Sequence, residues 1–117
     1  MKSPRFLWLS TFLIAVTSIN AQTLKIADAK NHLGETGTVC GKVVSERTAT
    51  SSKGEPTFIN LDEPYPNQTF TIVIWEEDRQ DLGSLPTQGS RVCATGKIQL
   101  YRGVPEIVVR SVGQLSH

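Results

Sequence analysis

Residues 91–110 read RVCATGKIQLYRGVPEIVVR and hold the most specific pattern in the chain. From Arg91 to Tyr101, small or apolar residues alternate with others at the period of a half-buried β-strand. The residues on the apolar face are Val92, Ala94, Gly96, Ile98 and Leu100. Arg102-Gly103 predicts a tight turn, because Gly103 can adopt a positive φ angle, and 104–110 predicts a second strand. The stretch therefore predicts a β-hairpin.

Three earlier segments also have the composition and period of β-strands. They run from Thr38 to about Arg47, over 57–61 and over 69–75, and the last is the richest in β-branched and aromatic residues. The first places Val39, Gly41 and Val43 on one face and Cys40 and Lys42 on the other. The polar run 48–55 predicts an exposed loop. The chain is thus expected to contain five strands, and the inner-face glycines suit strands that coil strongly.

Short helical signals lie outside these strands. Ile26, Ala29 and Leu33 recur at spacings of three and four, and Gly34 stands where a glycine often ends a helix. The acidic stretch 76–82 predicts a helical turn between the third and fourth strands. Residues 111–117 are expected to form a tail without regular structure.

This order of strands resembles the OB-fold, and more narrowly the exported bacterial branch of the anticodon-binding-like nucleic-acid-binding OB domains. The segments that carry the resemblance are 37–44, 56–61, 70–75 and 92–98, the last of which runs into 101–109. The most specific piece is Gly96-Lys97 followed by Tyr-x-Gly-x-Pro-Glu-Ile at 101–107. The resemblance implies an all-β fold, a five-stranded Greek-key barrel with a short N-terminal helix and a short helical turn between strands three and four.

The N-terminal segment has the features of an export signal. Lys2 and Arg5 precede an apolar stretch that is shorter than the ~20 residues a spanning helix needs. The segment then becomes small and polar up to Ala21, so we expect a signal peptide over 1–21, with cleavage after Ser18 or an uncleaved anchor as alternatives. Residues 22–117 are expected to form a single periplasmic or secreted OB-fold domain with its core at about 34–110, and no stable membrane span after cleavage.

The charge balance limits how nucleic acid could be held. The full chain has 12 Lys and Arg against 11 Asp and Glu, a net charge of +1. Loss of Lys2 and Arg5 with the signal leaves 10 against 11, a charge of −1. Proteins that bind mainly by neutralising phosphates are usually clearly basic. Binding of nucleic acid is therefore expected to be weak and sensitive to salt.

The chain contains two cysteines, Cys40 and Cys93. An even number of cysteines in an exported protein is a candidate disulfide, whereas structural zinc needs four ligands. Both cysteines fall on the outer faces of their strands, the first and the fourth. Closure of a five-stranded barrel would pair these two strands, which would make a Cys40–Cys93 bridge geometrically reasonable.

The resemblance also indicates where a ligand would lie. An OB-fold ligand usually crosses strands two and three, between the first–second and fourth–fifth loops. The strand residues expected on that exposed face are Phe58, Asn60, Thr71, Val73 and Trp75. The loop residues expected beside it are Arg47, Lys53, Tyr101 and Arg102. These side chains could stack bases or sugars and attract phosphates. Packing within the barrel explains Phe58 and Trp75 equally well, and Tyr101 could instead pack against Pro105.

Catalysis has little support in the sequence. The two histidines, His32 and His117, lie far apart in the chain, and no nucleophile or metal-ligand motif is present. The acidic run Glu76-Glu77-Asp78 with Asp81 is better explained as a solvated connector than as a cation site. We therefore expect no enzyme activity, no cofactor and no metal.

Two functional hypotheses remain open at the level of the sequence. The first is an exported, non-catalytic OB-fold module that binds single-stranded nucleic acid through strands two and three and the flanking loops. The alternative is a disulfide-stapled envelope or stress-related interaction protein. Its ligand would be a small molecule, a glycan or a protein, and it would have no role with nucleic acid.

Overall fold

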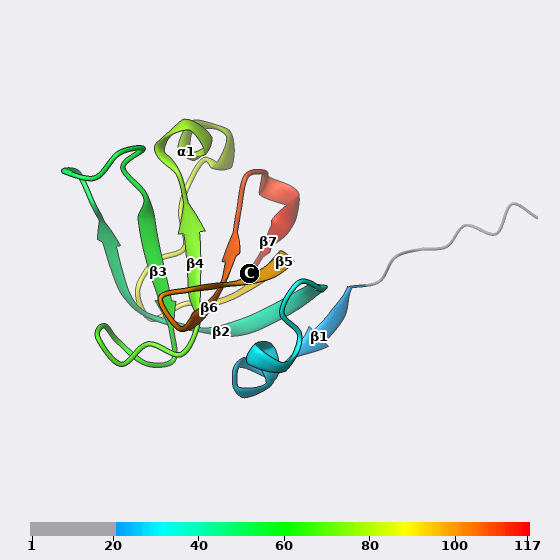
Figure 1. Ribbon diagram of the computed structural model, residues 1–117. Coiled ribbons are helices and arrows are strands. Elements are labelled where there is room, and N and C mark those ends of the chain that lie inside the picture. The colour runs from blue at the N-terminus through cyan, green and yellow to red at the C-terminus, as the bar shows by residue number, and fades with distance from the viewer. Residues whose placement is uncertain (1–20) are drawn as a thin grey trace, which may run out of the picture.

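The computed structural model describes residues 21–117 and shows an all-β fold (Figure 1). The signal peptide expected over 1–21 lies, apart from Ala21, outside the described residues. The strands are β1 (Gln22–Leu24), β2 (Thr36–Thr48), β3 (Thr57–Leu61), β4 (Thr71–Ile74), β5 (Arg91–Tyr101), β6 (Val104–Val108) and β7 (Leu115–Ser116). The helices are the 3-10 helices η1 (Ile26–Asn31) and η2 (Val112–Gln114) and the α-helix α1 (Glu76–Leu82).

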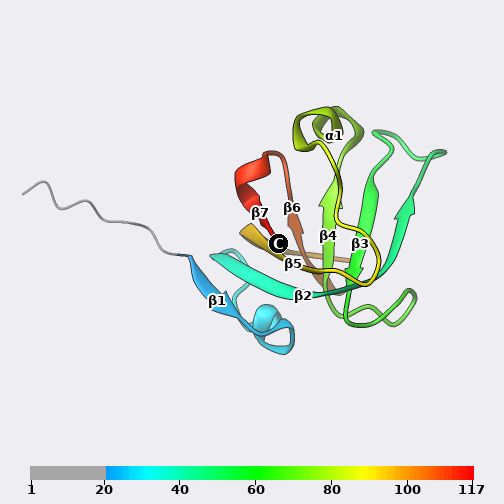
Figure 2. The same ribbon diagram turned by 180° about the vertical axis from the view of Figure 1, so that it is seen from behind.

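Five strands close into a barrel. β2 pairs with β3, β3 with β4 and β5 with β6, all antiparallel, whereas β4 and β6 run parallel. The antiparallel pairing of β5 with β2 completes the ring. Figures 1 and 2 show these strands wrapped around one interior, with α1 across one end. The expected barrel of five strands is confirmed, and β1 and β7 extend its wall by pairing with β2 and β5.

The long strand β2 makes closure possible because it belongs to two sheets. Its first half, Thr36–Lys42, pairs with β5, and its second half, from Val43, pairs with β3. The register shifts between Val43 and Ser45. Such an irregularity bends a strand and increases its twist, which lets one strand turn the corner of a barrel.

The barrel core is formed by the apolar faces that the alternation predicts. In β2, Val39 and Val43 are buried, and in β5 the same is true of Val92, Ala94 and Ile98. The other buried apolar side chains of the core cluster are Leu24, Ala29, Ile59, Leu61, Phe70, Ile72, Ile74, Leu82, Ile107 and Val109. Leu100 was expected on the same face but is 53% exposed. It lies beyond the core, where β5 continues into its hairpin with β6.

Two inner-face glycines allow close packing against the strands. A Cβ atom on Gly41 would lie 2.7 Å from Ile26 Cδ1 and 3.0 Å from the Cβ of Leu61. A Cβ on Gly96 would lie 2.9 Å from the Cγ2 of Ile107. Side chains at these positions would push η1, β3 or β6 away from the barrel wall. The two glycines are therefore needed because neighbouring elements pack closely against them, and not because the chain turns there.

The N-terminal helix is confirmed in its position, although it is a 3-10 helix that buries Ala29. Leu33 lies past its end and is 43% exposed. The helical turn expected over 76–82 is α1, which buries Leu82. Within residues 21–117, no helix is both long enough and apolar enough to cross a membrane.

The expectation of an unstructured tail over 111–117 is wrong. Ser111 and Gln114 form a capping box at η2, and β7 pairs with β5. Gln114 Nε2 donates to the carbonyl oxygens of Thr95 and Val108, at 3.0 and 3.1 Å. One glutamine thus fixes the end of the chain against two strands. Apolar periodicity in the sequence does not predict such a contact, because the contact depends on a single polar side chain.

The expected disulfide is present. Cys40 and Cys93 are direct partners in the β2–β5 register, and their sulfur atoms are bonded at 2.02 Å. Two residues away in the same register, the hydroxyl oxygens of Thr38 and Thr95 are hydrogen-bonded at 2.7 Å. The barrel is therefore closed along β2 and β5 by backbone pairing, a polar side-chain pair and a covalent bond.

Candidate nucleic-acid interface

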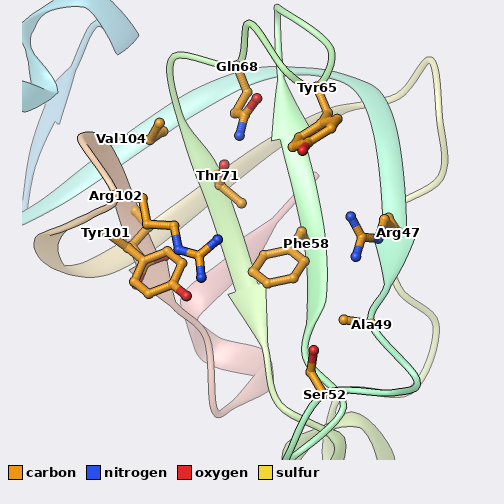
Figure 3. Close-up of a pocket in the computed structure, with 11 residues that line it drawn as sticks. Arg47, Ala49, Ser52, Phe58, Tyr65, Gln68, Thr71, Tyr101, Arg102 and Val104 are labelled. Carbon is orange, nitrogen blue, oxygen red and sulfur yellow. The ribbon is translucent and has the colours of Figure 1, made fainter.

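Two adjoining hollows lie over β3 and β4 and share the lining residues Ser52, Phe58, Tyr101 and Glu106. Their volumes are about 250 and about 180 Å³. We call them together the groove. The first is also lined by Arg47, Ala49, Tyr65, Gln68, Thr71, Arg102 and Val104, and the second by Lys53, Pro56, Val73 and Trp75. The groove lies between the loop after β2 and the β5–β6 hairpin, as the resemblance implies (Figure 3).

Phe58 stands at the centre of the groove. It lies on β3 between Thr57 and Ile59, which are fully buried, and is itself partly exposed because successive strand residues point to opposite faces. Figure 3 shows its ring between Arg47 on one side and Tyr101 and Arg102 on the other. The groove therefore offers an aromatic surface with guanidinium groups to either side.

The β5–β6 hairpin positions the aromatic and cationic groups of one wall. Arg102 and Gly103 both have positive φ angles, 48° and 81°, as the central pair of a two-residue hairpin turn. Glycine adopts this conformation freely, and the expected role of Gly103 is confirmed. The Arg102 guanidinium carbon lies 5.3 Å from the centroid of the Tyr101 ring, within the range of a cation–π contact.

The loop between β2 and β3 forms the opposite wall. Gly54 has a φ of 77°, and a Cβ on it would lie 2.9 Å from Trp75 Cε3. The loop therefore packs directly on the Trp75 ring, which remains partly exposed in the second hollow beside Lys53. Trp75 can thus pack against the loop and still present part of its ring to a ligand in the groove.

The expectation that Asn60, Thr71 and Val73 are exposed is wrong, because they are only 4%, 6% and 2% exposed. Thr71 Oγ1 donates to Asn60 Oδ1 at 2.8 Å, and Asn60 Nδ2 donates to the hydroxyl of Ser45 at 3.0 Å. Thr71 and Val73 still line the groove, but Asn60 does not. Asn60 lies beside the register shift in β2, where its amide bridges β2 and β4. Its position makes it a support for Thr71.

The structure brings residues into the groove that sequence reasoning missed. Tyr65 and Gln68 come from the loop between β3 and β4, and Tyr65 is 65% exposed. Gln68 Oε1 is fully buried without a hydrogen-bond partner among the described residues. Glu106 comes from β6. The alternation with buried Ile107 could have shown that Glu106 faces outward, but its place in the groove depends on the long-range pairing of β6 with β4.

Glu106 is the carboxylate of the groove and is 8% exposed. Gln99 Nε2 donates to its Oε1 atom at 3.0 Å. Burial raises the pKa of this carboxyl above its ordinary value of 4.5, and the hydrogen bond from Gln99 opposes that rise. An acidic side chain is therefore held largely out of solvent in a groove that otherwise has cationic walls.

Replacing Glu106 by glutamine is expected to raise the thermal midpoint at pH 7, because the variant has no carboxyl that must ionise in a buried position. Because folding raises the pKa of this acid, its contribution to stability is complete in acid and is lost as pH rises through the raised pKa. Glutamine does not ionise, so the difference from the wild type should vanish in acid. Glu77→Gln, on an exposed position of α1, should show no such pH-dependent gain. An equal gain at both pH values would contradict this explanation.

The arrangement in the groove suits a flexible anion with flat rings. Aromatic side chains from β3, the loops and the hairpin provide stacking surfaces, and Arg47, Lys53 and Arg102 provide cations. Neither histidine lines the groove. Within residues 21–117, no group of three or more His, Cys, Asp or Glu side chains could hold a metal ion.

Comparison with solved structures shows the same fold. A candidate aspartyl-tRNA synthetase from Leishmania major Friedlin superposes with a TM-score of 0.55 at 12% identity, over 88% of this chain and 22% of the synthetase. This chain thus corresponds to a small part of that enzyme. A candidate nucleic acid-binding lipoprotein from Klebsiella pneumoniae subsp. pneumoniae MGH 78578 gives 0.52 at 14% identity, over 75% of this chain and 87% of that protein.

A further solved structure, an OBody bound to hen egg-white lysozyme, gives a TM-score of 0.54 at 16% identity, over 74% of this chain and 86% of that one. None of the curated proteins matches the sequence significantly. The family of OB-fold nucleic acid binding domains matches residues 38–115, which include every lining residue of the groove. Because this match covers more than half of the chain, the protein belongs to the family of OB-fold nucleic acid binding domains.

Proposed function

We propose that the protein binds single-stranded nucleic acid in the groove. The observation that carries the proposal is the Phe58 ring between Arg47 and Arg102, on the face that OB-folds use for ligands. Bases would stack on Phe58 and Tyr101, and the cations of the walls would hold the phosphates. Stacking tolerates many sequences because every base has a π face, so the contact suits a single strand rather than a duplex.

The proposed role is binding without catalysis, in an exported protein. The groove combines aromatic rings, cations and one buried carboxylate, which is a set for holding a strand rather than for activating a nucleophile. The Cys40–Cys93 bond supports export, because disulfides persist in oxidising compartments. The charged and apolar segment before Ala21 supports the same location.

A fluorescence polarisation titration of the purified protein with a labelled single-stranded oligonucleotide tests the proposal. We expect saturable binding at low salt that weakens with added salt. Three cations near the strand predict a slope of log K against log salt of about −2, since each neutralised phosphate of a single strand contributes about 0.7. Arg102→Ala should reduce the magnitude of this slope by about 0.7.

Lys97→Ala is the matched control for this titration. Lys97 is an exposed cation on β5 that does not line the groove, so its loss should leave the slope nearly unchanged. Absence of saturable binding at low salt would refute the proposed function and favour the alternative ligand classes, a small molecule, a glycan or a protein.

A further inference from the structure

The Cys40–Cys93 bond lies on the outer surface of the barrel, on the wall that β2 and β5 form together. Both cysteines are partly exposed, whereas the residues before and after each of them in the strand are buried. Neither cysteine lines the groove, which lies over β3 and β4. The bond is therefore accessible from solvent on a surface that the proposed function does not use.

A separate hollow of about 320 Å³ lies beside this bond, where β1 runs parallel to β2 (Figure 2). Its lining residues are Cys40, Asp62, Arg91 and the segment 23–26. Leu24 of β1 lies beside Val39 of β2, and both side chains are buried. Lys25, whose backbone is extended, and Cys40 are the next residues of these two segments, so both face outward. Of the two cysteines, Cys40 is the one that lines the hollow.

The position of the hollow determines which sulfur atom a thiol can attack. A thiolate that displaces one sulfur from another must approach in line, from the side opposite the sulfur that leaves. β2 lies between β1 and β5, so the β1 side of Cys40 is the side away from Cys93. The hollow therefore opens the in-line approach to the Cys40 sulfur.

Cations surround the bond. Lys42 and Arg91 are direct partners in the β2–β5 register, two residues from the cysteines and on the same outer face. Lys25, Lys42 and Arg91 are exposed, and none of them takes part in an ion pair within residues 21–117. Asp62 is the acid of the hollow, and its Oδ1 atom accepts a hydrogen bond from the backbone N–H of Lys42 at 2.9 Å. The hollow and the adjoining pair thus hold three cations and one acid.

We propose that the Cys40–Cys93 bond is a site of thiol–disulfide exchange with thiols that carry a carboxylate, and that the incoming thiolate attacks the sulfur of Cys40. A bond forms between the thiolate and Cys40 Sγ while the bond between the two cysteine sulfurs breaks. The electron pair of the broken bond leaves with Cys93, which becomes a thiolate. The incoming thiol is oxidised and Cys93 is reduced, so the step needs no further oxidant. The product is a mixed disulfide on Cys40.

The cations favour this step at both ends of the reaction. Lys25 and Arg91 attract the carboxylate of the incoming thiol and raise its concentration in the hollow. Arg91 also lies two residues before Cys93 on the same face, and a neighbouring guanidinium stabilises a departing thiolate. The backbone pairing of β2 with β5 keeps Cys93 beside Cys40, so Cys93 can later displace the bound thiol and restore the bond. The exchange is therefore reversible.

The test compares the rates at which 3-mercaptopropionate, which carries a carboxylate, and neutral 2-mercaptoethanol open the bond in the folded protein. Each rate is divided by the rate of the same thiol with a small neutral disulfide, which corrects for the intrinsic reactivity of the thiol. We expect the corrected rate to be about threefold to tenfold higher for the carboxylate at low salt. High salt should remove the difference, because it screens exposed charges.

Two variants separate local charge from other causes. Lys25→Gln with Arg91→Gln removes the cations of the hollow and should abolish the preference for the carboxylate. Lys97→Gln is the matched control, because Lys97 is an exposed cation on the same face of β5 that does not line the hollow. This control should keep the preference.

Mass spectrometry identifies the sulfur that is attacked. Excess N-ethylmaleimide, added soon after the thiol, should alkylate the released cysteine before the bond closes again. We expect the added thiol on Cys40 and the maleimide on Cys93. The reverse assignment would overturn the inference, as would equal corrected rates for the two thiols or a preference that survives in the folded double variant. If the double variant does not fold, each single substitution should reduce the preference, and no reduction in either would also overturn the inference.

Discussion

Replacing Cys40 and Cys93 together by alanine is expected to lower the free energy of unfolding by about 2–5 kcal/mol. The bond joins residues separated by 53 positions. A cross-link of that span restricts the unfolded chain, and the chain-entropy estimate for its contribution is roughly 4 kcal/mol. Small domains have net stabilities of about 5–15 kcal/mol, so the loss would be a large fraction of the total. Urea unfolding followed by tryptophan fluorescence measures the change.

The pair Thr38 and Thr95 provides a matched control in the same two strands. Thr38→Val with Thr95→Val removes the 2.7 Å hydroxyl contact but leaves the chain cross-linked. Its effect should be close to that of one hydrogen bond, about 0.5–1.5 kcal/mol. Reductant should destabilise the wild type as much as the double cysteine substitution and should not affect that variant. Equal stability of oxidised and reduced wild type would contradict a stabilising role of the bond.

Replacing Phe58 by alanine is expected to weaken binding of a single-stranded oligonucleotide by about 5- to 150-fold. Loss of one base–aromatic stack costs about 1–3 kcal/mol, and Phe58 has the central ring of the groove. A polarisation titration at low salt measures the change. Thermal unfolding of the same variant should show that it is folded at the temperature of the titration, because a partly buried ring also contributes to packing.

Leu33→Ala is the control for this substitution. Leu33 is an exposed apolar side chain that does not line the groove, so its removal should leave the affinity unchanged. An unchanged affinity in folded Phe58→Ala would place the strand elsewhere on the protein. An equal loss in both variants would point to a general effect on the fold.

The strands of the barrel could be predicted from the sequence because their signal is local. Val39 and Val43 in β2 and Val92, Ala94 and Ile98 in β5 recur at every second position, and the period alone assigns them to one face. The C-terminal segment could not be predicted in the same way. Its position depends on Gln114, which reaches carbonyl groups of β5 and β6. A single polar contact between distant segments produces no periodic pattern in the sequence.

The residues of the candidate site also fall into those that the sequence could predict and those that depend on contacts between distant segments. Arg47, Phe58, Trp75, Tyr101 and Arg102 lie in the groove, because the expected topology brings their strands and loops to one face. The contribution of each to binding stays a prediction. Asn60 was expected on that face by alternation along β3, but a buried amide network near the bend of β2 holds it. Alternation assigns a face, whereas burial depends on neighbouring strands.

Glu106 is a residue that the sequence did not predict to line the groove. Its neighbours in the sequence are Pro105 and Ile107, both buried, and nothing local distinguishes it from a solvated acid at the edge of a sheet. It becomes a groove residue because β6 lies beside β4 and because Gln99 on β5 contacts its carboxylate. Its place in the groove could be inferred only once these pairings were known.

Amide chemical shifts of the isotope-labelled protein, followed during titration with a short single-stranded oligonucleotide at low salt, locate bound nucleic acid residue by residue. We predict saturable shifts concentrated at groove residues on β3, β4, β6 and the hairpin turn, including Phe58, Thr71, Arg102 and Glu106. The amide chemical shifts of η1, which does not line the groove, should stay unchanged. Shifts confined to η1 or to other residues outside the groove, or no shifts at all, would contradict binding of single-stranded nucleic acid in the groove.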